Sequence, residues 1–310
     1  MISRRTFLEG SSLALAAMTS LKLSAAASNT GPLGRPIGLQ LYTVREEAGR
    51  DLAGTLEQIA AFGYREVETG RFFDKPAKVL RALFDDAGLA APSAHYGMAA
   101  LQTDLQKKID DVAALGAKYL VCSSPAVPDN SLSAKAIPGG ITLDHWKWNA
   151  EQLNRIGEQT KKAGIRTAYH NHNAEFRSYD GVVAYDQLLS WTDPALVTME
   201  MDIGWVVTAG VDPVTYLRQH SQRISLLHVK EVRKDAKTVT DQYLSQTTEL
   251  GRGKVDWQRI FAAADPRYLE HYFVEQENFD GSSPLESARI NCDYLRTLMI
   301  QERPSSTRNM

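Results

Sequence analysis

Short runs of apolar and β-branched residues recur along the chain, and a stretch with helical spacing of apolar residues follows each run. Such a bounded run predicts a buried strand, whereas apolar residues three and four positions apart predict an amphipathic helix. Eight runs fit the strand pattern, at residues 37–42, 64–69, 91–96, 119–123, 165–171, 197–202, 224–229 and 271–276. The chain therefore alternates strand and helix from residue 37 onward.

The helical stretches carry their own start signals. Asp51 and Asp212 stand where an N-cap is favoured, and Pro76, Pro213 and Pro284 fit a first helical turn. Glycine precedes several of the strands, where it suits the left-handed position after a helix. The predicted helices are residues 52–61, 76–87, 101–115, 143–163, 184–190, 213–220, 256–263 and 284–299.

Eight strand and helix units predict an α/β fold, a single (β/α)8 TIM barrel, since such barrels take about 250 residues. A doubly wound sheet is the alternative, but it requires a glycine-rich phosphate loop after the first strand, and LQLYTVREE has none. No linker rich in Pro, Ser and Gly divides the chain. We expect the barrel at residues 37–300, a flexible lead-in at 28–36 and a flexible tail at 301–310.

Two predicted connections are long, at residues 124–142 and 230–255. In this fold the loops that follow the strands form the active site. We therefore expect both segments to form walls or lids of a pocket.

The first 27 residues differ from the rest of the chain. They combine the paired arginines Arg4 and Arg5, a short apolar stretch and the small-residue run 25–27, which predicts an export signal. An ordinary amphipathic helix is the alternative. The order SRRTFL resembles the twin-arginine signal, which implies cleavage after Ala27, a periplasmic location and a metal or cofactor loaded before export.

The composition and net charge of the chain limit the kinds of binding partner that we expect. The chain has 310 residues, 43% hydrophobic and 23% charged, with a formal net charge of −2, so nothing favours nucleic acid or an anionic membrane surface. A small molecule is the expected ligand. Cys122 lies in an apolar run and Cys292 in a predicted helix, which predicts two buried thiols rather than a disulfide or a zinc-thiolate site.

Polar side chains follow most of the predicted strands, and a barrel brings the carboxyl ends of its strands to one pocket. Clustered carboxylates and imidazoles require a compensating cation, and this mixed oxygen and nitrogen set suits Mn, Co, Mg, Zn or Fe. Such an ion polarises a carbonyl or hydroxyl oxygen while a side chain moves a proton. The set comprises Gln40, Tyr42, Glu68, His95, Ser123, Ser124, His170, Asn171, His172, Glu175, Glu200, Asp202, His228, Lys230, Glu231, Glu275, Gln276 and Glu277.

Some of these residues have structural alternatives. His95 fits a core histidine as well as a site residue, and Glu68 fits a salt bridge as well as a site residue. From the alternation of side chains along a strand, we expect Glu200 and Glu231 to point outward or to support the ligands from behind.

These residues occur in segments that resemble the xylose-isomerase-like barrel superfamily, often labelled sugar phosphate isomerase/epimerase, which also includes apurinic endonucleases and inosose dehydratases. The segments are IGLQLYTVREE, YREVE, SAHYG, GIRTAYHNHNAEF, MEMDIGWVVTAGVDP, LLHVKEV, ELGRGKVDW and YFVEQEN. They cover nearly all of the chain after the predicted signal and are specific for the superfamily, not for one substrate.

The resemblance implies one divalent metal held by Glu, Asp, His and Glu from the last four strands. Asp202, His228 and Glu275 match the last three. Where relatives carry the first glutamate this chain has His170, and Glu175 follows five residues later. We predict Glu175 as the ligand, with His170 as an acid/base group or the alternative ligand.

The resemblance also implies proton transfer through an enediolate. Glu175 or His170 would act on one side of the substrate and Glu275 on the other, and Lys230 would stabilise the negative charge. A histidine at position 170 suits elimination or hydration of a keto-sugar equally well. The predicted substrate-binding residues are Gln40, Glu68, His95, His172 and Glu277.

The leading prediction is a metal-dependent isomerase or epimerase of a non-phosphorylated sugar or sugar derivative. One alternative is a lyase or hydratase that acts on 3-keto-glycosides by β-elimination. A non-catalytic sugar-binding barrel is another, and a repair endonuclease is disfavoured because the chain is slightly acidic. The expected partner is a small carbohydrate, with no nucleic acid and no membrane beyond export, and a homo-oligomer is left open.

Overall fold

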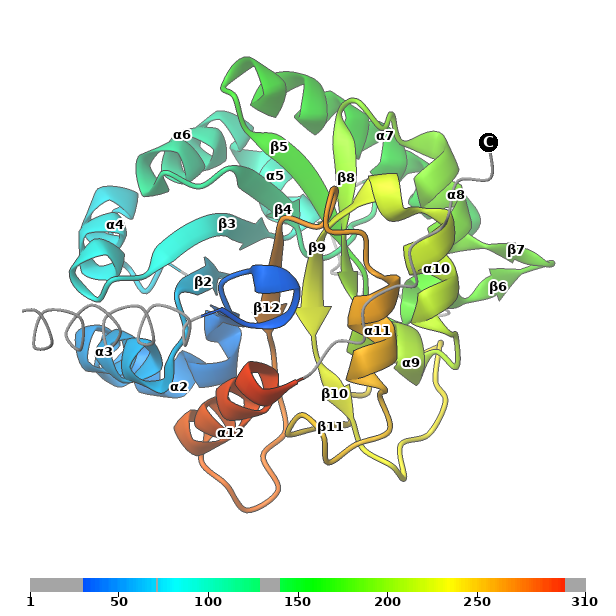
Figure 1. Ribbon diagram of the computed structural model, residues 1–310. Helices are drawn as coiled ribbons and strands as arrows, with labels where there is room; N and C mark the ends of the chain where they lie inside the picture. The colour runs from blue at the N-terminus through cyan, green and yellow to red at the C-terminus, as the bar shows by residue number, and fades with distance from the viewer. Residues whose placement is uncertain (1–29, 71, 129–139, 299–310) are drawn as a thin grey trace, which may run out of the picture.

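The computed structural model describes residues 30–70, 72–128 and 140–298. Eight parallel strands close into one barrel with helices around it (Figure 1), which confirms the predicted (β/α)8 fold. The strands are β1 (Gly38–Gln40), β2 (Glu66–Thr69), β3 (Ala90–Tyr96), β4 (Tyr119–Cys122), β5 (Arg166–His170), β8 (Val197–Asp202), β9 (Ile224–Val229) and β12 (His271–Val274). The predicted signal at 1–27, the first two residues of the lead-in (28 and 29) and the tail lie outside the described residues.

The helices surround the barrel in the order in which their strands occur. The main ones are α3 (Leu52–Phe62), α4 (Ala77–Asp86), α6 (Leu105–Leu115), α7 (Leu143–Lys162), α8 (Ala184–Trp191), α10 (Pro213–Gln219), α11 (Trp257–Ala263) and α12 (Pro284–Thr297). All eight correspond to predicted helices. Shorter helices, α2 (Arg45–Arg50), α5 (Met98–Thr103) and α9 (Ile203–Thr208), follow β1, β3 and β8.

One predicted helix, residues 101–115, is two helices in the structure. Asp104 separates α5 from α6, with an extended φ of −157°, and its side chain accepts a hydrogen bond from the backbone of Lys107 at 3.2 Å. An aspartate at this position satisfies a free amide of the new helix, which stabilises the break.

The inward face of the barrel changes character along the strands. Its lower part is filled by a small apolar cluster that is separate from the layer between strands and helices, formed by Tyr119, Val121, Ala168, Leu226 and Phe273. Two residues further along three of these strands, on the same face, stand His170, His228 and Glu275. The apolar cluster is therefore the floor on which the titratable side chains lie.

The long connection at 230–255 contains a two-stranded sheet, β10 (Glu231–Val232) with β11 (Thr247–Thr248). Glu231 points away from the pocket, as strand alternation predicts. Its carboxylate accepts hydrogen bonds from the indole of Trp257 at 2.9 Å and from the backbone of Gly251 and Val255 at 3.1 and 3.0 Å. A Cβ at Gly253 would lie 2.1 Å from the carbonyl oxygen of Val232, so the close packing of this connection requires glycine there.

Both cysteines are buried and free, as the sequence predicts. No helix among the described residues is long and apolar enough to cross a membrane.

Candidate active site

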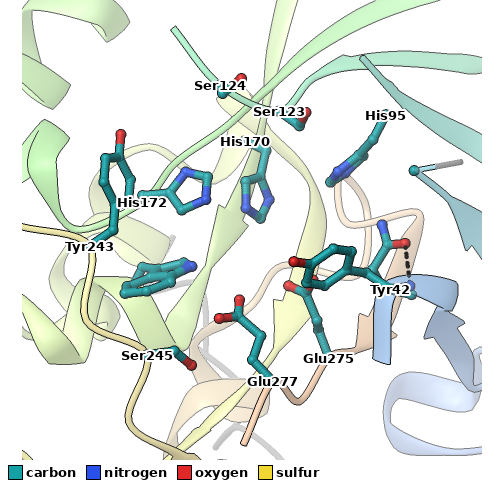
Figure 2. Close-up of a pocket in the computed structure, with 13 residues that line it drawn as sticks. Tyr42, His95, Ser123, Ser124, His170, His172, Tyr243, Ser245, Glu275 and Glu277 are labelled. Carbon is teal, nitrogen blue, oxygen red and sulfur yellow. Dashed lines mark hydrogen bonds between the residues drawn. The ribbon is translucent and has the colours of Figure 1, made fainter. Parts of the chain in front are cut away.

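A pocket of about 370 Å³ opens at the carboxyl ends of the strands. Figure 2 shows its side chains converging from opposite sides of the barrel mouth, with His95 and His170 facing Glu275 and Glu277. Its volume lies within the range of roughly 300–1,000 Å³ that is usual for small-molecule sites. The lining residues are Gln40, Tyr42, Gly70, His95, Ser123, Ser124, His170, His172, Trp205, Tyr243, Ser245, Glu275 and Glu277.

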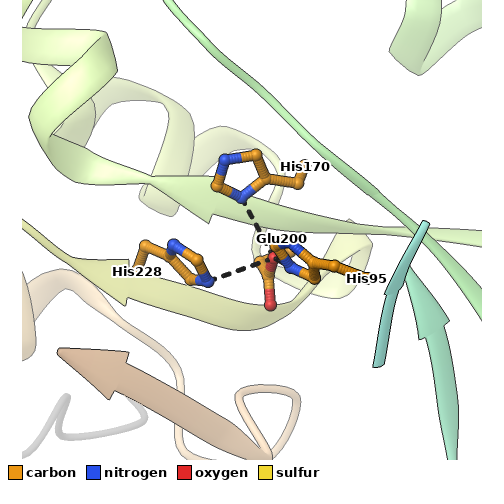
Figure 3. Close-up of side chains that lie close together, drawn as sticks. All are labelled: His95, His170, Glu200 and His228. Atoms are coloured by element: carbon orange, nitrogen blue, oxygen red, sulfur yellow. Dashed lines mark hydrogen bonds and ion pairs between the residues drawn. The ribbon is translucent and has the colours of Figure 1, made fainter. Parts of the chain in front are cut away.

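Glu200 lies at the centre of three imidazoles (Figure 3). Its Oε2 is 2.6 Å from His95 Nε2, 3.0 Å from His170 Nδ1 and 3.3 Å from His228 Nε2. Glu200 therefore does not point outward, whereas the expected supporting position agrees with its contacts to the three imidazoles. Glu200 and Asp202 are two residues apart on β8, so a pleated strand places both on the inward face.

Glu68 of β2 contacts two of the same imidazoles. Its Oε2 is 2.8 Å from both His95 Nε2 and His228 Nε2, and it accepts a hydrogen bond from the amide of Gln40 at 2.7 Å. Ser93 donates a further hydrogen bond to the other oxygen. Glu68 is thus a buried ion-pair residue beneath the pocket, and it orients both His95 and His228.

Lys230 is buried and is not among the residues that line the cavity. Its Nζ is 3.0 Å from Asp202 Oδ2, 2.9 Å from Glu275 Oε2 and 2.9 Å from Glu277 Oε1. The chain comes close here because of Gly204, where a Cβ would lie 2.7 Å from Lys230 Cγ. The ammonium group therefore pairs with three carboxylates at once and holds them in place.

Asp202 is fixed by the helix that it begins. Its Oδ1 accepts a hydrogen bond from the backbone of Trp205 at 2.9 Å as the N-cap of α9. Its backbone amide donates to the side chain of Asn171 at 3.0 Å. The second oxygen, Oδ2, is consequently the one that faces Lys230, 3.0 Å away, and His228 Nδ1, 3.5 Å away.

Two overlapping groups of side chains in the described part of the chain have the spacing of a metal site, with ligand atoms within 4.8 Å of one another. One consists of His95, His170, Glu200 and His228, and the other of His170, Asp202, His228 and Glu275. Two imidazole nitrogens with two carboxylate oxygens, the donors of the second group, suit zinc and other first-row divalent ions. Lys230 also contacts Glu277, so its ammonium keeps a partner when an ion takes Asp202 and Glu275.

The pKa shifts follow from burial and from this network of charges. Burial lowers the pKa of His170, and the neighbouring groups of His228, His172, His95 and Lys230 lower it further, so its imidazole is neutral. Burial would also lower the pKa of His95, but the carboxylates of Glu68 and Glu200 raise it to about 10. Burial and the charge of Glu68 raise the pKa of Glu200 to about 7.

Glu275 and Lys230 shift in opposite directions. Burial would raise the pKa of Glu275, but Lys230 and His228 outweigh it and hold the pKa well below the usual range. Burial would lower the pKa of Lys230, but Asp202, Glu275 and Glu277 raise it well above 10.5. The site therefore combines an ionised carboxylate at Glu275 with a protonated imidazole at His95, both in contact with the pocket.

Glu175 is in neither candidate metal group of the described chain and does not line the pocket. It lies in a short 3-10 helix, Ala174–Phe176, and the hydroxyl of Tyr169 donates to its Oε1 at 2.7 Å. Tyr169 belongs to the apolar layer between strands and helices, on the face of β5 opposite to His170. The structure thus brings His170 to the cluster and leaves Glu175 behind the strand.

The pocket also contains residues that the sequence analysis did not single out. Trp205 follows Asp202 in α9, and Tyr243 and Ser245 come from the long connection at 230–255. That connection was predicted to form a wall. Its individual residues carry no signal in sequence, because they lie outside any strand or helix and have no periodicity.

Comparison with known proteins places this site in context. The sequence profile of the xylose isomerase-like TIM barrel family matches residues 56–298. An inosose dehydratase of Lacticaseibacillus casei is 25% identical over 265 residues, covering 79% of this chain and 88% of that enzyme. A sugar phosphate isomerase/epimerase from Parabacteroides distasonis ATCC 8503 aligns with a TM-score of 0.69 and 26% identity, covering 84% of this chain and 93% of that one. The zinc-bound IOLI protein, with a TM-score of 0.62, 13% identity and coverage of 83% and 95%, shares the fold.

Proposed function

The chain belongs to the xylose isomerase-like TIM barrel family, and within it we propose a metal-dependent lyase that eliminates an oxygen leaving group from the position β to a ring ketone. The substrate class is a non-phosphorylated keto-sugar, keto-cyclitol or 3-keto-glycoside. The inosose dehydratase relatives support a reaction of the dehydratase type. The site adds a physical reason for the same choice.

One observation carries the proposal: imidazoles, those of His95 and His170, and not a second glutamate, face Glu275 across the pocket. Figure 2 shows His170 opposite Glu275, and Glu175 lies behind β5 against Tyr169. Proton exchange between the two faces of one carbon needs a base on each side, whereas elimination needs one base and one acid. The ionised Glu275 and the protonated His95 supply that unequal pair.

His170, Asp202, His228 and Glu275 would hold the metal ion. When bound, the ion polarises the ketone of the substrate and lowers the pKa of the neighbouring carbon acid. The contacts of Glu275 with His228 and Lys230 run through Oε2, so Oε1 serves as the base that removes this proton. Lys230 keeps Glu275 and Glu277 in position below the substrate and acts as a positioning residue.

The electrons that the elimination moves all stay within the substrate and its leaving group. The electrons of the broken carbon–hydrogen bond form a carbon–carbon double bond, and the bond from the next carbon to the leaving oxygen breaks. His95 donates a proton to that oxygen, while Glu68 and Glu200 orient the imidazole at 2.8 and 2.6 Å from Nε2. The products are an unsaturated ketone and water or an alcohol.

Isomerase or epimerase activity is the second candidate. It begins with the same removal of a proton beside a carbonyl group, and the relative from Parabacteroides distasonis is described as an isomerase/epimerase. The two reactions diverge afterwards, since epimerisation returns a proton to carbon and breaks no carbon–oxygen bond.

Export of the protein, predicted from residues 1–27, belongs to the same proposal. A periplasmic enzyme meets sugars and glycosides from outside the cytoplasm, and the described pocket lining has no arginine or lysine for a phosphate group. Both points favour an unphosphorylated substrate.

A product assay tests the proposal. Zinc-loaded protein is incubated in deuterated water with phenyl 3-keto-β-D-glucopyranoside or with a keto-cyclitol, and products are identified by NMR and mass spectrometry. Release of phenol or water with formation of an unsaturated ketone is the expected result. Deuterium incorporation with inverted configuration at that carbon, in an intact glycoside or cyclitol that keeps its leaving group, would instead establish epimerisation.

A further inference from the structure

Three aromatic side chains form one side of the pocket, and we refer to His172, Trp205 and Tyr243 together as the aromatic wall. The ring centres of His172 and Trp205 are 5.3 Å apart, and those of His172 and Tyr243 are 5.0 Å apart. Tyr243 meets Trp205 edge-on at 6.4 Å with an interplanar angle of 86°. The three rings come from different segments, the loop after β5, α9 and the connection between β10 and β11, and they pack as one surface.

Buried polar side chains fix the wall in place. Asn173, which is buried, donates hydrogen bonds at 2.8 Å to the carbonyl oxygens of both Val239 and Gln242, immediately before Tyr243. On the other side of Tyr243, the side chain of Asn278 accepts a hydrogen bond from Ser245 at 2.8 Å. The segment that carries Tyr243 is thus anchored at both ends, so the wall does not have to be ordered by a ligand.

Trp205 presents an unused hydrogen-bond donor at this wall. The residue is 4% exposed and lines the pocket, and its indole Nε1 has no hydrogen-bond partner among the described residues. A buried donor without a partner costs free energy, which a ligand oxygen recovers when it binds. The wall therefore fits a group that has an apolar face and an acceptor oxygen.

We propose that the aromatic wall is the aglycone subsite, which makes the substrate a glycoside with an apolar or aromatic leaving group rather than a free sugar or cyclitol. This inference rests on the proposed lyase function. The keto-sugar ring lies over Glu275 and His95, and the aglycone packs on Trp205 and Tyr243. The Trp205 indole donates a hydrogen bond to the glycosidic oxygen, which links the two parts.

The elimination then has a defined leaving group. The proton on C2, beside the C3 ketone, passes to Glu275, and the C1–C2 double bond forms as the C1–oxygen bond breaks. The glycosidic oxygen receives the proton of the His95 imidazole and departs with the aglycone as an alcohol or a phenol. No oxidant or further reactant is needed after the C3 ketone is present.

Binding of unoxidised glucosides tests the subsite without requiring turnover. Calorimetric titrations of the zinc-loaded protein with phenyl and methyl β-D-glucopyranoside are compared for wild type, Tyr243→Ala, Tyr243→Phe and Trp205→Phe. We expect the phenyl glucoside to bind about tenfold more tightly than the methyl glucoside, because of the buried apolar area. Tyr243→Ala should reduce this preference to about twofold, Tyr243→Phe should preserve it, and Trp205→Phe should weaken the phenyl glucoside about fivefold.

Equal affinity of wild type for the two glucosides, no binding of the phenyl glucoside, or equal weakening of both by Tyr243→Ala would overturn the subsite. The result is separable from the proposed reaction. A preference for the phenyl glucoside without elimination from its 3-keto derivative would overturn the lyase proposal alone. Elimination without any preference would overturn the aglycone subsite alone.

Discussion

Glu200 and Glu175 are both fully buried carboxyl groups, and burial is the main cause that raises the pKa of each to about 7. Each has one oxygen without a hydrogen-bond partner among the described residues, but the groups around them differ. Glu200 lies inside the barrel, where the imidazoles of His95 and His170 contact one of its oxygens at 2.6 and 3.0 Å. Glu175 lies behind β5, where the hydroxyl of Tyr169 is its partner and its Oε2 has none among the described residues.

The comparison shows that a perturbed pKa does not by itself mark a catalytic group. Glu200 shares its space with groups that can hold a metal ion and exchange protons, and the pocket opens above them. Glu175 belongs to neither candidate metal group of the described chain, and its hydroxyl partner Tyr169 is part of the apolar layer. Whether a buried carboxyl group belongs to the site depends on the side of the strand on which it lies.

The largest expected effect is on the inside of the barrel. Asp202→Asn removes a charged ligand, and we expect kcat/KM to fall by more than about 10³-fold, because metal binding and the proton transfer that depends on it are both lost. Glu175→Gln, the matched change behind the strand, should retain metal at the wild-type level. The metal content of both variants is measured by mass spectrometry after dialysis. Equal metal loss in the two variants would contradict the distinction.

Lys230→Gln tests the inside of the barrel further, because it removes the cation that compensates the carboxylates there. Three buried or half-buried carboxylates lose a partner, so we expect the metal-free variant to be less stable by about 3 kcal/mol. Saturating zinc should recover most of this loss, because the ion replaces the missing positive charge. Urea unfolding with and without zinc measures the effect. A loss of stability that zinc leaves unchanged would mean that Lys230 and the ion do not share Asp202 and Glu275.

Glu200→Gln keeps the shape of the side chain but removes its charge. We expect kcat/KM to fall by about 10²-fold, because His95 loses one of the two carboxylates that keep its imidazole protonated for donation to the leaving group. Zinc content should be unchanged. Loss of zinc would instead assign the ion to the group of His95, His170, Glu200 and His228.

Glu175→Gln should alter stability rather than activity. The folded protein raises the pKa of Glu175 from 4.5 to about 7, so the folded state binds this proton more tightly than the unfolded state. Stability from this group is fully present below about pH 4.5 and is lost as the pH rises through about 7. The glutamine variant lacks that loss, so it should be more stable than wild type by about 1–3 kcal/mol at pH 8 and nearly equal at pH 5. Denaturant unfolding at both pH values checks this, and a difference independent of pH would refute it.

Much of the fold could be predicted from sequence because each strand and helix has a local signal. Strand length, helical periodicity and caps such as Asp51 and Asp212 are properties of short segments. The break at Asp104 was missed because the apolar spacing continues across it. The cap that makes the break stable involves one side chain only.

The site was harder to predict because the role of each residue depends on the direction in which its side chain points. His170 and Glu175 are both plausible ligands in a linear sequence, and only the turn after β5 decides which one faces the pocket. Glu200 illustrates the same point, since correct counting along the strand places it with Asp202. Trp205 and Tyr243 meet only because separate segments fold over one another, which no local pattern records.

The central claim, that His170 on the inner face of β5 completes the metal site and Glu175 does not, is tested most directly by anomalous diffraction from crystals loaded with zinc. We expect an anomalous peak between His170, Asp202, His228 and Glu275, with ligand distances of about 2.0–2.2 Å. A peak coordinated by Glu175, or one held by His95 and Glu200 away from Asp202 and Glu275, would contradict it.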